Sequence, residues 1–230
     1  MRNFTTRIFI LCLLFCTTHV TVKAQELSFG ADLVSNYIWR GSKTADVSFQ
    51  PEIALDWAGF TVSACGSTDF TGETFELDLS VFYAVGNFSF GITDYYGVYD
   101  KEEDYSYFKY RRGNAHTFEA TVEYTVSESI PLTLGWNTSL GEKNTEHPIE
   151  AYSTYITAAY PFSVLGIDCN AELAMTPWKG AYADECNVVN VSLELAKEIP
   201  ITEKYALPIY TQVIFNPAAE KAFFVFGLTI

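Results

Sequence analysis

The chain has 230 residues, with 14 basic and 28 acidic side chains and a formal net charge of −14 at pH 7. This acidic balance argues against binding to nucleic acid, whose phosphates attract a basic surface. The longest uncharged stretch beyond residue 24, residues 151–167, is interrupted by Pro161, so no membrane-spanning helix of about 20 residues is predicted. Abundant Tyr, Phe, Thr and Val favour strands instead.

Residues 1–24 have the pattern of a secretory signal peptide. Arg2 and Arg7 precede a short apolar run, and Val22 and Ala24 occupy the positions where a signal peptidase selects small residues. This pattern predicts export and cleavage after Ala24. Three of the 14 basic residues leave with the segment, so 11 basic and 28 acidic side chains would remain.

Most of the remaining chain alternates between apolar and polar residues with a period of two, which is typical of a strand with two different faces. In residues 74–85, for example, Phe75, Leu77 and Leu79 alternate with Glu76 and Asp78. The pattern predicts twelve strands, near residues 27–39, 47–57, 60–68, 74–85, 88–98, 115–126, 132–140, 150–160, 166–176, 188–196, 205–215 and 221–230.

The connections between these strands alternate in length. Ala58-Gly59 and Gly86-Asn87 predict tight turns, whereas the intervening connections are longer. Outer-membrane barrels have short periplasmic turns and longer outer loops. Residues 25–230 are therefore predicted to form an all-β domain, a transmembrane antiparallel up-and-down β-barrel of about twelve strands, in a bacterial outer membrane.

A soluble β-sandwich also alternates, with its apolar face inward. Three features favour the membrane barrel: the signal peptide, polar faces that are rich in Ser, Thr, Gly and Asn but poor in Lys, and aromatic residues near strand ends. These aromatic residues are predicted to form the girdle at the membrane interfaces; they are Tyr37, Trp39, Trp57, Tyr83, Tyr96 and Tyr160.

The last strand places four apolar residues, Phe224, Phe226, Leu228 and Ile230, on one face. This arrangement resembles the C-terminal signal that the barrel-assembly machinery reads, although that signal more often ends in Phe. The expected partners are therefore outer-membrane lipid and this machinery. The alternative is an ordinary final strand.

The polar positions predict a barrel lumen that is lined by many acidic side chains. The residues predicted to line it are Asp32, Asn36, Arg40, Glu52, Asp56, Glu76, Asp78, Glu119, Glu123, Asp168, Glu172 and Glu194. An acidic lumen favours cations, so passive passage of small solutes with a preference for cations is the predicted function. The alternative is a side-chain-filled lumen in a non-conducting structural or adhesive barrel with functional outer loops.

Arg40 has two interpretations. It could select anions at the mouth, or it could form a salt bridge with a lumen acid such as Asp32 or Glu52; the salt bridge is the favoured interpretation. By the same alternation, Tyr37 and Trp39 are expected to face outward and Asn36 and Arg40 inward.

The segment Ser35-Asn36-Tyr37-Ile38-Trp39-Arg40-Gly41 resembles the opening of the TorF porin family (the Gcw_chp domain), which reads Ser-Asn-Tyr-x-aromatic-Arg-Gly after a strand. The remainder of the chain matches in length and strand rhythm rather than in motifs. The resemblance implies an outer-membrane barrel with a transport role and brings no catalytic residues.

An enzyme is not expected, and neither is a cofactor. Nucleophilic catalysis needs a nucleophile next to a base, and neither His116 nor His147 has a serine elbow beside it. No Cys/His spacing suggests zinc. Cys65, Cys169 and Cys186 are an odd number of scattered thiols and not a disulfide framework, although one bridge is possible.

The loop at residues 100–113 mixes acids, tyrosines and bases without the ligand spacing of a calcium loop. It is predicted to fold over the barrel mouth. Binding of Ca²⁺, a sugar or a partner surface is the alternative.

Overall fold

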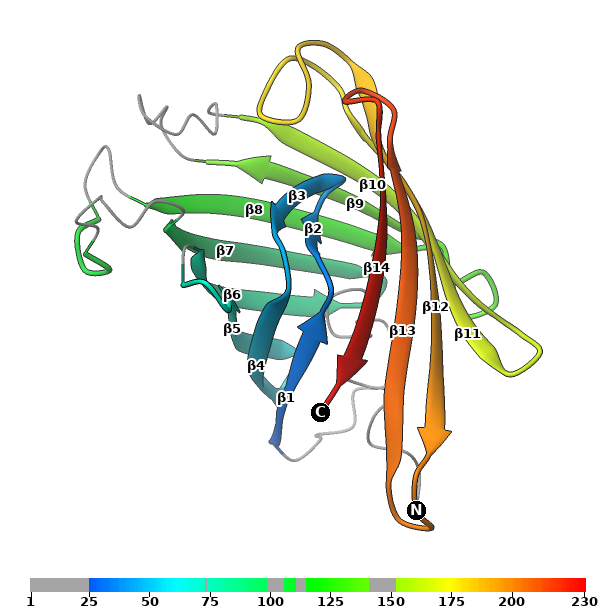
Figure 1. Cartoon of the computed structure of the whole chain (residues 1–230). Coiled ribbons are helices and arrows are strands. Elements are labelled where there is room, and N and C mark those ends of the chain that lie inside the picture. Colours follow the sequence, from blue (N-terminus) through cyan, green and yellow to red (C-terminus); the bar gives the residue numbers. More distant parts are fainter. Residues whose placement is uncertain (1–24, 73, 99–105, 111–114, 141–151) are drawn as a thin grey trace.

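The computed structural model describes residues 25–72, 74–98, 106–110, 115–140 and 152–230. The predicted signal peptide and His147 lie outside these residues. Within them, twelve antiparallel strands close into a barrel (Figure 1): β1 (Glu26–Val34), β4 (Ser48–Trp57), β5 (Phe60–Asp69), β6 (Phe75–Val85), β7 (Phe88–Val98), β8 (His116–Thr125), β9 (Thr133–Ser139), β10 (Thr154–Val164), β11 (Ile167–Thr176), β12 (Asn187–Pro200), β13 (Ala206–Asn216) and β14 (Lys221–Thr229).

Closure occurs between the first and last strands of the barrel. β1 pairs with β4 along its whole length, and the end of β1 pairs with β14 through registers such as Asp32 with Thr229. Every other barrel strand pairs with its neighbours in sequence order. The predicted fold class, an up-and-down antiparallel barrel of twelve strands, is confirmed.

The tight turns lie at one end of the barrel. Ala58 and Gly59 have φ of 50° and 88°, and Leu165 and Gly166 have φ of 54° and 76°. Glycine adopts such angles at no steric cost, which suits it to two-residue hairpin turns. This end, which also holds the start of β1 and the end of β14, is called the short-turn end here, and the opposite end the long-loop end.

Three strands differ from their predicted bounds by four residues or more. The strand expected at residues 27–39 leaves the barrel wall after Val34, where Ser35 and the Asn36 side chain still bond to β14. The Ser35 amide donates to the Phe226 carbonyl at 2.8 Å, and the Asn36 side chain donates to the Phe224 carbonyl at 3.2 Å. The strand expected at residues 150–160 runs instead from Thr154 to Val164, with Pro161 inside it. The strand expected at residues 188–196 continues to Pro200.

Beyond Val34 the chain forms a second, two-stranded sheet, β2 (Tyr37–Trp39) and β3 (Ser42–Ala45). Figure 1 shows this hairpin, in blue, beside β14. It returns the chain to β4, whose first residue Ser48 pairs with Val34. The hairpin is therefore an insertion between two strands that are already neighbours in the wall.

The outer face of the barrel is apolar. Along β1, for example, Leu27 and Phe29 are 58% and 71% exposed. Side chains of the same kind are exposed around the ring: Ile53, Leu55, Val62, Val81, Phe90, Ile92, Leu134, Leu193, Val213 and Phe224. Soluble proteins rarely expose contiguous apolar surface of this extent. The fold is therefore an outer-membrane-type barrel and not a soluble sandwich.

In the part of the chain that the structure describes, no helix is long and apolar enough to cross a membrane.

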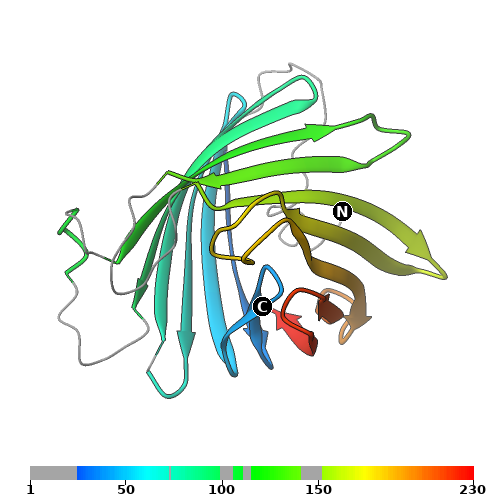
Figure 2. The same cartoon turned by 90° about the horizontal axis from the view of Figure 1, so that it is seen from above.

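Seen from above, β4–β7 (blue to teal) and β12–β14 (orange to red) lie on different sides of the barrel (Figure 2). The interior has two different halves along these sides. The packed half, around β10–β14 and the end of β1, holds buried apolar side chains such as Tyr155, Val189, Tyr210, Ile214 and Val225. The hollow half, inside β4–β8, presents small and acidic side chains and encloses the site described next.

Candidate functional site

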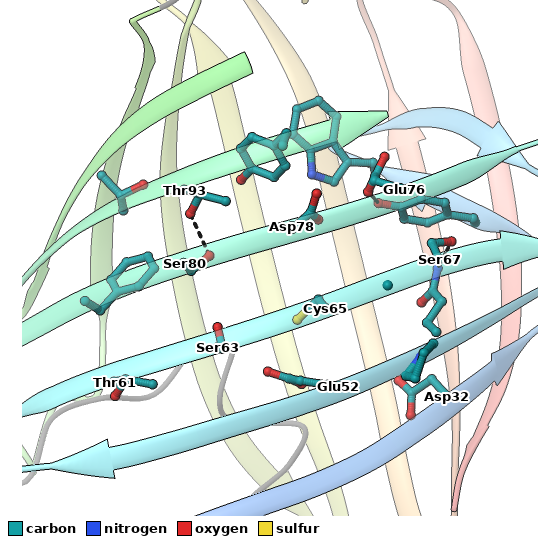
Figure 3. Close-up of a pocket in the computed structure, with 18 of the residues that line it drawn as sticks. Asp32, Glu52, Thr61, Ser63, Cys65, Ser67, Glu76, Asp78, Ser80 and Thr93 are labelled. Atoms are coloured by element: carbon teal, nitrogen blue, oxygen red, sulfur yellow. Dashed lines mark hydrogen bonds between the residues drawn. The ribbon is translucent and has the colours of Figure 1, made fainter. Parts of the chain in front are cut away.

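A cavity of about 470 Å³ occupies the hollow half of the barrel. Several inward positions of its wall carry small hydroxyl side chains, such as Thr61, Ser63 and Ser80. Figure 3 shows these residues projecting from adjacent strands, with the Ser80 hydroxyl 2.9 Å from that of Thr93. Small side chains at these positions leave the volume that larger ones fill in the packed half.

The cavity is strongly acidic. The carboxylates that line it are Asp32, Glu52, Glu76, Asp78 and Glu123. Among the described residues that line it, Arg40 is the one basic side chain. The sequence analysis placed all six of these residues in the lumen, and the structure brings them to one chamber.

The remaining acids of the predicted lumen set lie elsewhere along the inner wall. Asp56 and Asp168 are near the short-turn end, where they accept hydrogen bonds of 2.6 Å from Thr61 and Ser163. Glu172 and Glu194 are on the inner faces of β11 and β12, in the packed half, and Glu119 is on β8. None of these five acids lines the cavity. Asn36 does not line it either, since its side chain donates to the Phe224 carbonyl.

The hairpin β2–β3 closes the cavity at the long-loop end. Its turn residues, Arg40 and Gly41, have φ of 49° and 77°. Gly41 rests on the opposite wall: its carbonyl accepts a 3.0 Å hydrogen bond from Asn216, and a Cβ there would be 2.2 Å from the Val189 carbonyl oxygen. Only glycine fits this contact, so the hairpin tip is fixed against β12 and β13.

Arg40 anchors the hairpin to the third side of the lumen. Its two terminal nitrogens donate to the two carboxylate oxygens of Glu119 at 2.5 and 2.7 Å, and one of them also donates to the Tyr182 hydroxyl. The side chains of Arg40 and Glu119 are only 12% and 4% exposed. A two-point pair of this kind is among the stronger charged contacts in proteins. It matches the favoured interpretation of Arg40 as a salt-bridge residue, but its partner is Glu119 and not Asp32 or Glu52.

Aromatic rings enclose the Arg40 guanidinium. Its central carbon is 4.5 Å from the ring centre of Trp39, 4.7 Å from that of Tyr155 and 5.7 Å from that of Tyr182. A guanidinium over an aromatic face is attracted by the negative charge of the π-system. The hairpin tip is thus held by a charge pair and by cation–π contacts together.

The rings are themselves held in place. The Tyr155 hydroxyl donates to Glu172 at 3.0 Å, and Asn190 donates to the same carboxylate oxygen at 2.7 Å. Tyr182, in the loop after β11, packs on Tyr155 with ring centres 5.3 Å apart. Burial raises the pKa of the Tyr182 phenol against the opposing effect of the Arg40 charge, so this group stays neutral.

The expectation that Tyr37 and Trp39 belong to the outer girdle is wrong. Both line the cavity, since the chain turns inward at Ser35 and the outward parity of β1 no longer applies. The Tyr37 hydroxyl donates to Glu76 at 2.6 Å, and Trp39 meets Tyr95 edge-on at 5.7 Å.

The other girdle residues are on the outer wall. Trp57, Tyr83 and Tyr160 are exposed there, between 40% and 58%. Tyr96 is also on the outer side, but it is only 6% exposed because Tyr107 and His116 cover it.

The described part of the long loop, residues 106–110, lies on the outer wall and not over the mouth as predicted. The ring centre of Tyr110 is 4.1 Å from that of His116. His116 contacts Asp94 through Nδ1 at 2.8 Å and the Tyr107 carbonyl through Nε2 at 2.6 Å. This histidine therefore has both ring nitrogens engaged.

Sequence reasoning missed Tyr95, Tyr155 and Tyr182. The first two have the inward parity of their strands, but no local pattern connects them with Arg40. Tyr182 lies in a loop with no periodic signal. In the described residues, Cys65, Cys169 and Cys186 form no disulfide, and no group of three or more His, Cys, Asp or Glu residues could hold a metal ion.

Comparison with solved structures gives a match to the crystal structure of BamA from Haemophilus ducreyi lacking POTRA domains 1–3. The identity is 13% and the TM-score 0.44, over 85% of this chain and 42% of that chain. The chain thus spans less than half the length of that protein. No curated protein matches the chain.

Residues 26–152 match the family described as "Putative MetA-pathway of phenol degradation". The match covers more than half of the chain, from β1 through β9, and so includes the hairpin and the strands that wall the cavity. The resemblance of residues 35–41 to the TorF family is not confirmed. The chain belongs to the family described as putative MetA-pathway of phenol degradation.

Proposed function

We propose that this protein is a narrow passage for small solutes, with a preference for cations, in a bacterial outer membrane. The observation that carries the proposal is the charge of the cavity. Among the described residues that line it, five are carboxylates and one is basic, Arg40, which is already paired with Glu119. Walls of low dielectric concentrate such a field, so cations would be enriched in the cavity and anions depleted.

The membrane setting is part of the same proposal. The apolar outer face suits lipid, and the sequence of residues 1–24 predicts export. In this setting the short-turn end faces the periplasm and the long-loop end faces outward. Phe224 and Phe226 are exposed on the last strand, which supports its recognition by the barrel-assembly machinery.

The family's description names a phenol-degradation pathway. Small aromatic compounds are accordingly one class of solute that could cross the membrane through such a passage.

A non-conducting barrel with functional outer loops is the second candidate. One observation favours it: the hairpin occupies the mouth, and apolar side chains fill the packed half. The passage and the non-conducting barrel differ in whether ions cross.

The test is conductance of refolded residues 25–230 in a planar bilayer, with a salt gradient to measure selectivity. We expect small discrete steps and a reversal potential that favours cations. Heat-modifiable migration in SDS, measured on the same sample, would show that the barrel is folded. A silent bilayer from folded protein would overturn the passage and leave the non-conducting barrel.

A further inference from the structure

The site that holds Arg40 is built mainly by the barrel and not by the hairpin. Its acid, Glu119, is on β8, and its rings are Tyr95 on β7, Tyr155 on β10 and Tyr182 in the loop after β11. These four residues are called the cage here. Because they belong to the wall and one loop, the cage would remain if the hairpin moved away.

The chemistry of the cage is that of a receptor for an organic cation. Glu119 offers two oxygens to a planar fork of donors, and Tyr155 and Tyr182 present their rings to the charge. Carboxylates combined with aromatic faces recognise guanidinium and alkylated ammonium groups, which shed their water more easily than Na⁺ does. The Tyr95 hydroxyl donates to Glu119 at 3.3 Å and helps to orient it.

The hairpin presents Arg40 to this cage in the manner of a tethered ligand. Arg40 has a φ of 49° at the hairpin turn, the conformation that Ala58 and Leu165 also adopt in two-residue turns. The turn places the guanidinium in the cage, and a soluble cation of the same chemistry competes for the same contacts.

The cage also borders the cavity, since Tyr95 of the cage lines the cavity and so does Arg40, which occupies the cage. A cation that displaces Arg40 would therefore stand at the entrance of the acidic cavity, with the hairpin tip released from Glu119.

We propose that the cage is a binding site for a small organic cation of the guanidinium or alkylammonium class, which Arg40 occupies from within the chain. The incoming cation competes with Arg40 and releases the hairpin tip from Glu119, whereas Gly41 keeps its contact with Asn216. This rests on the proposed passage and names its solute class.

Binding is tested on the refolded barrel in detergent, by calorimetry with methylguanidinium. Arg40→Ala empties the cage, so it should bind methylguanidinium saturably and more tightly than the wild type, in which Arg40 must first be displaced. Urea, planar but neutral, should not bind. The matched control, Arg40→Ala with Glu119→Gln, should lose the binding, because the cation then has no counter-charge.

Heat-modifiable migration checks that each variant is folded. If Arg40→Ala does not fold, replacing residues 35–47 by Asn-Gly empties the cage by another route, since Val34 already pairs with Ser48. Failure of folded, emptied barrels to bind methylguanidinium, or equal binding with Glu119→Gln, would overturn the proposal.

The two proposals fail in different ways. Calorimetry needs no membrane, so binding by a protein that is silent in bilayers would support the cage and overturn the passage. Conductance without methylguanidinium binding would retain the passage and overturn the cage as a solute site. In wild-type pores, methylguanidinium should lengthen the open time, whereas Na⁺ at equal concentration should not.

Discussion

The hollow and packed halves of the barrel interior follow the same alternating pattern and yet differ in what they enclose. In β5 and β6 the inward positions carry residues such as Ser63, Cys65 and Asp78, and a cavity remains. In β13 and β14 they carry Tyr210, Ile214 and Val225, which pack together. The volume of the inward side chains, and not the strand pattern, determines where a barrel of twelve strands is open.

The hairpin divides its contacts between the two halves. Tyr37 donates to Glu76 in the hollow half, whereas Gly41 rests against Val189 and Asn216 in the packed half. The packed half thus supports the hairpin, which is called the cap of the cavity here. This difference between the halves can be tested by changing the cap, the acids and the support in turn.

The largest effect is expected from removing the cap. Joining Val34 to Ser48 through Asn-Gly in place of residues 35–47 should raise single-channel conductance several-fold, since the closed register of β1 and β4 is kept and the mouth is cleared. Planar-bilayer recording measures it. Unchanged conductance in a folded variant would mean that the hairpin does not limit passage.

The next effect concerns selectivity. Glu52→Gln, which removes one acid from the hollow half, should move the reversal potential toward zero, because the field in the cavity falls. Glu194→Gln, which removes one acid from the packed half, is the matched control and should leave the potential nearly unchanged. Equal shifts from the two variants would contradict the assignment of the conducting path to the hollow half.

A smaller effect is expected on the free energy of unfolding, which should respond differently to substitutions in the two halves. Ile214 is 3% exposed, so Ile214→Ala in the packed half should lower the free energy of unfolding by about 2–5 kcal/mol. Ser63→Leu adds volume in the hollow half, where the cavity can accept it, and should change that free energy by only about 0.5 kcal/mol. Urea unfolding in micelles measures both, and a large loss from Ser63→Leu would argue against an open chamber.

The strands could be predicted from sequence because the alternation of apolar and polar residues is visible within each short segment of the chain. Turn residues such as Ala58 and Gly59 fixed their ends to within a few residues. The same rule failed at Tyr37 and Trp39, because inward and outward positions alternate only while the chain stays in the wall, and β1 ends at Val34.

The site was predictable only in part. The inward acids followed from parity, but the partner of Arg40 did not, since Glu119 is 79 residues further along the chain and no local pattern links the two. The rings around Arg40 come from two strands and a loop. These rings come together only when the barrel closes, and the local sequence pattern does not indicate which strands then face each other.

Cys65 allows the most direct measurement of the capped acidic cavity, because its side chain lines that cavity. On intact cells, a variant that keeps only this cysteine would be treated with a cationic and an anionic methanethiosulfonate of similar size, with a variant that keeps only exposed Cys186 as the control. We predict that the cationic reagent reacts faster at Cys65, and that replacing residues 35–47 accelerates both reactions at Cys65 but not at Cys186. Equal rates for the two reagents, or rates at Cys65 that do not respond to loss of the hairpin, would contradict a cavity that is acidic and capped.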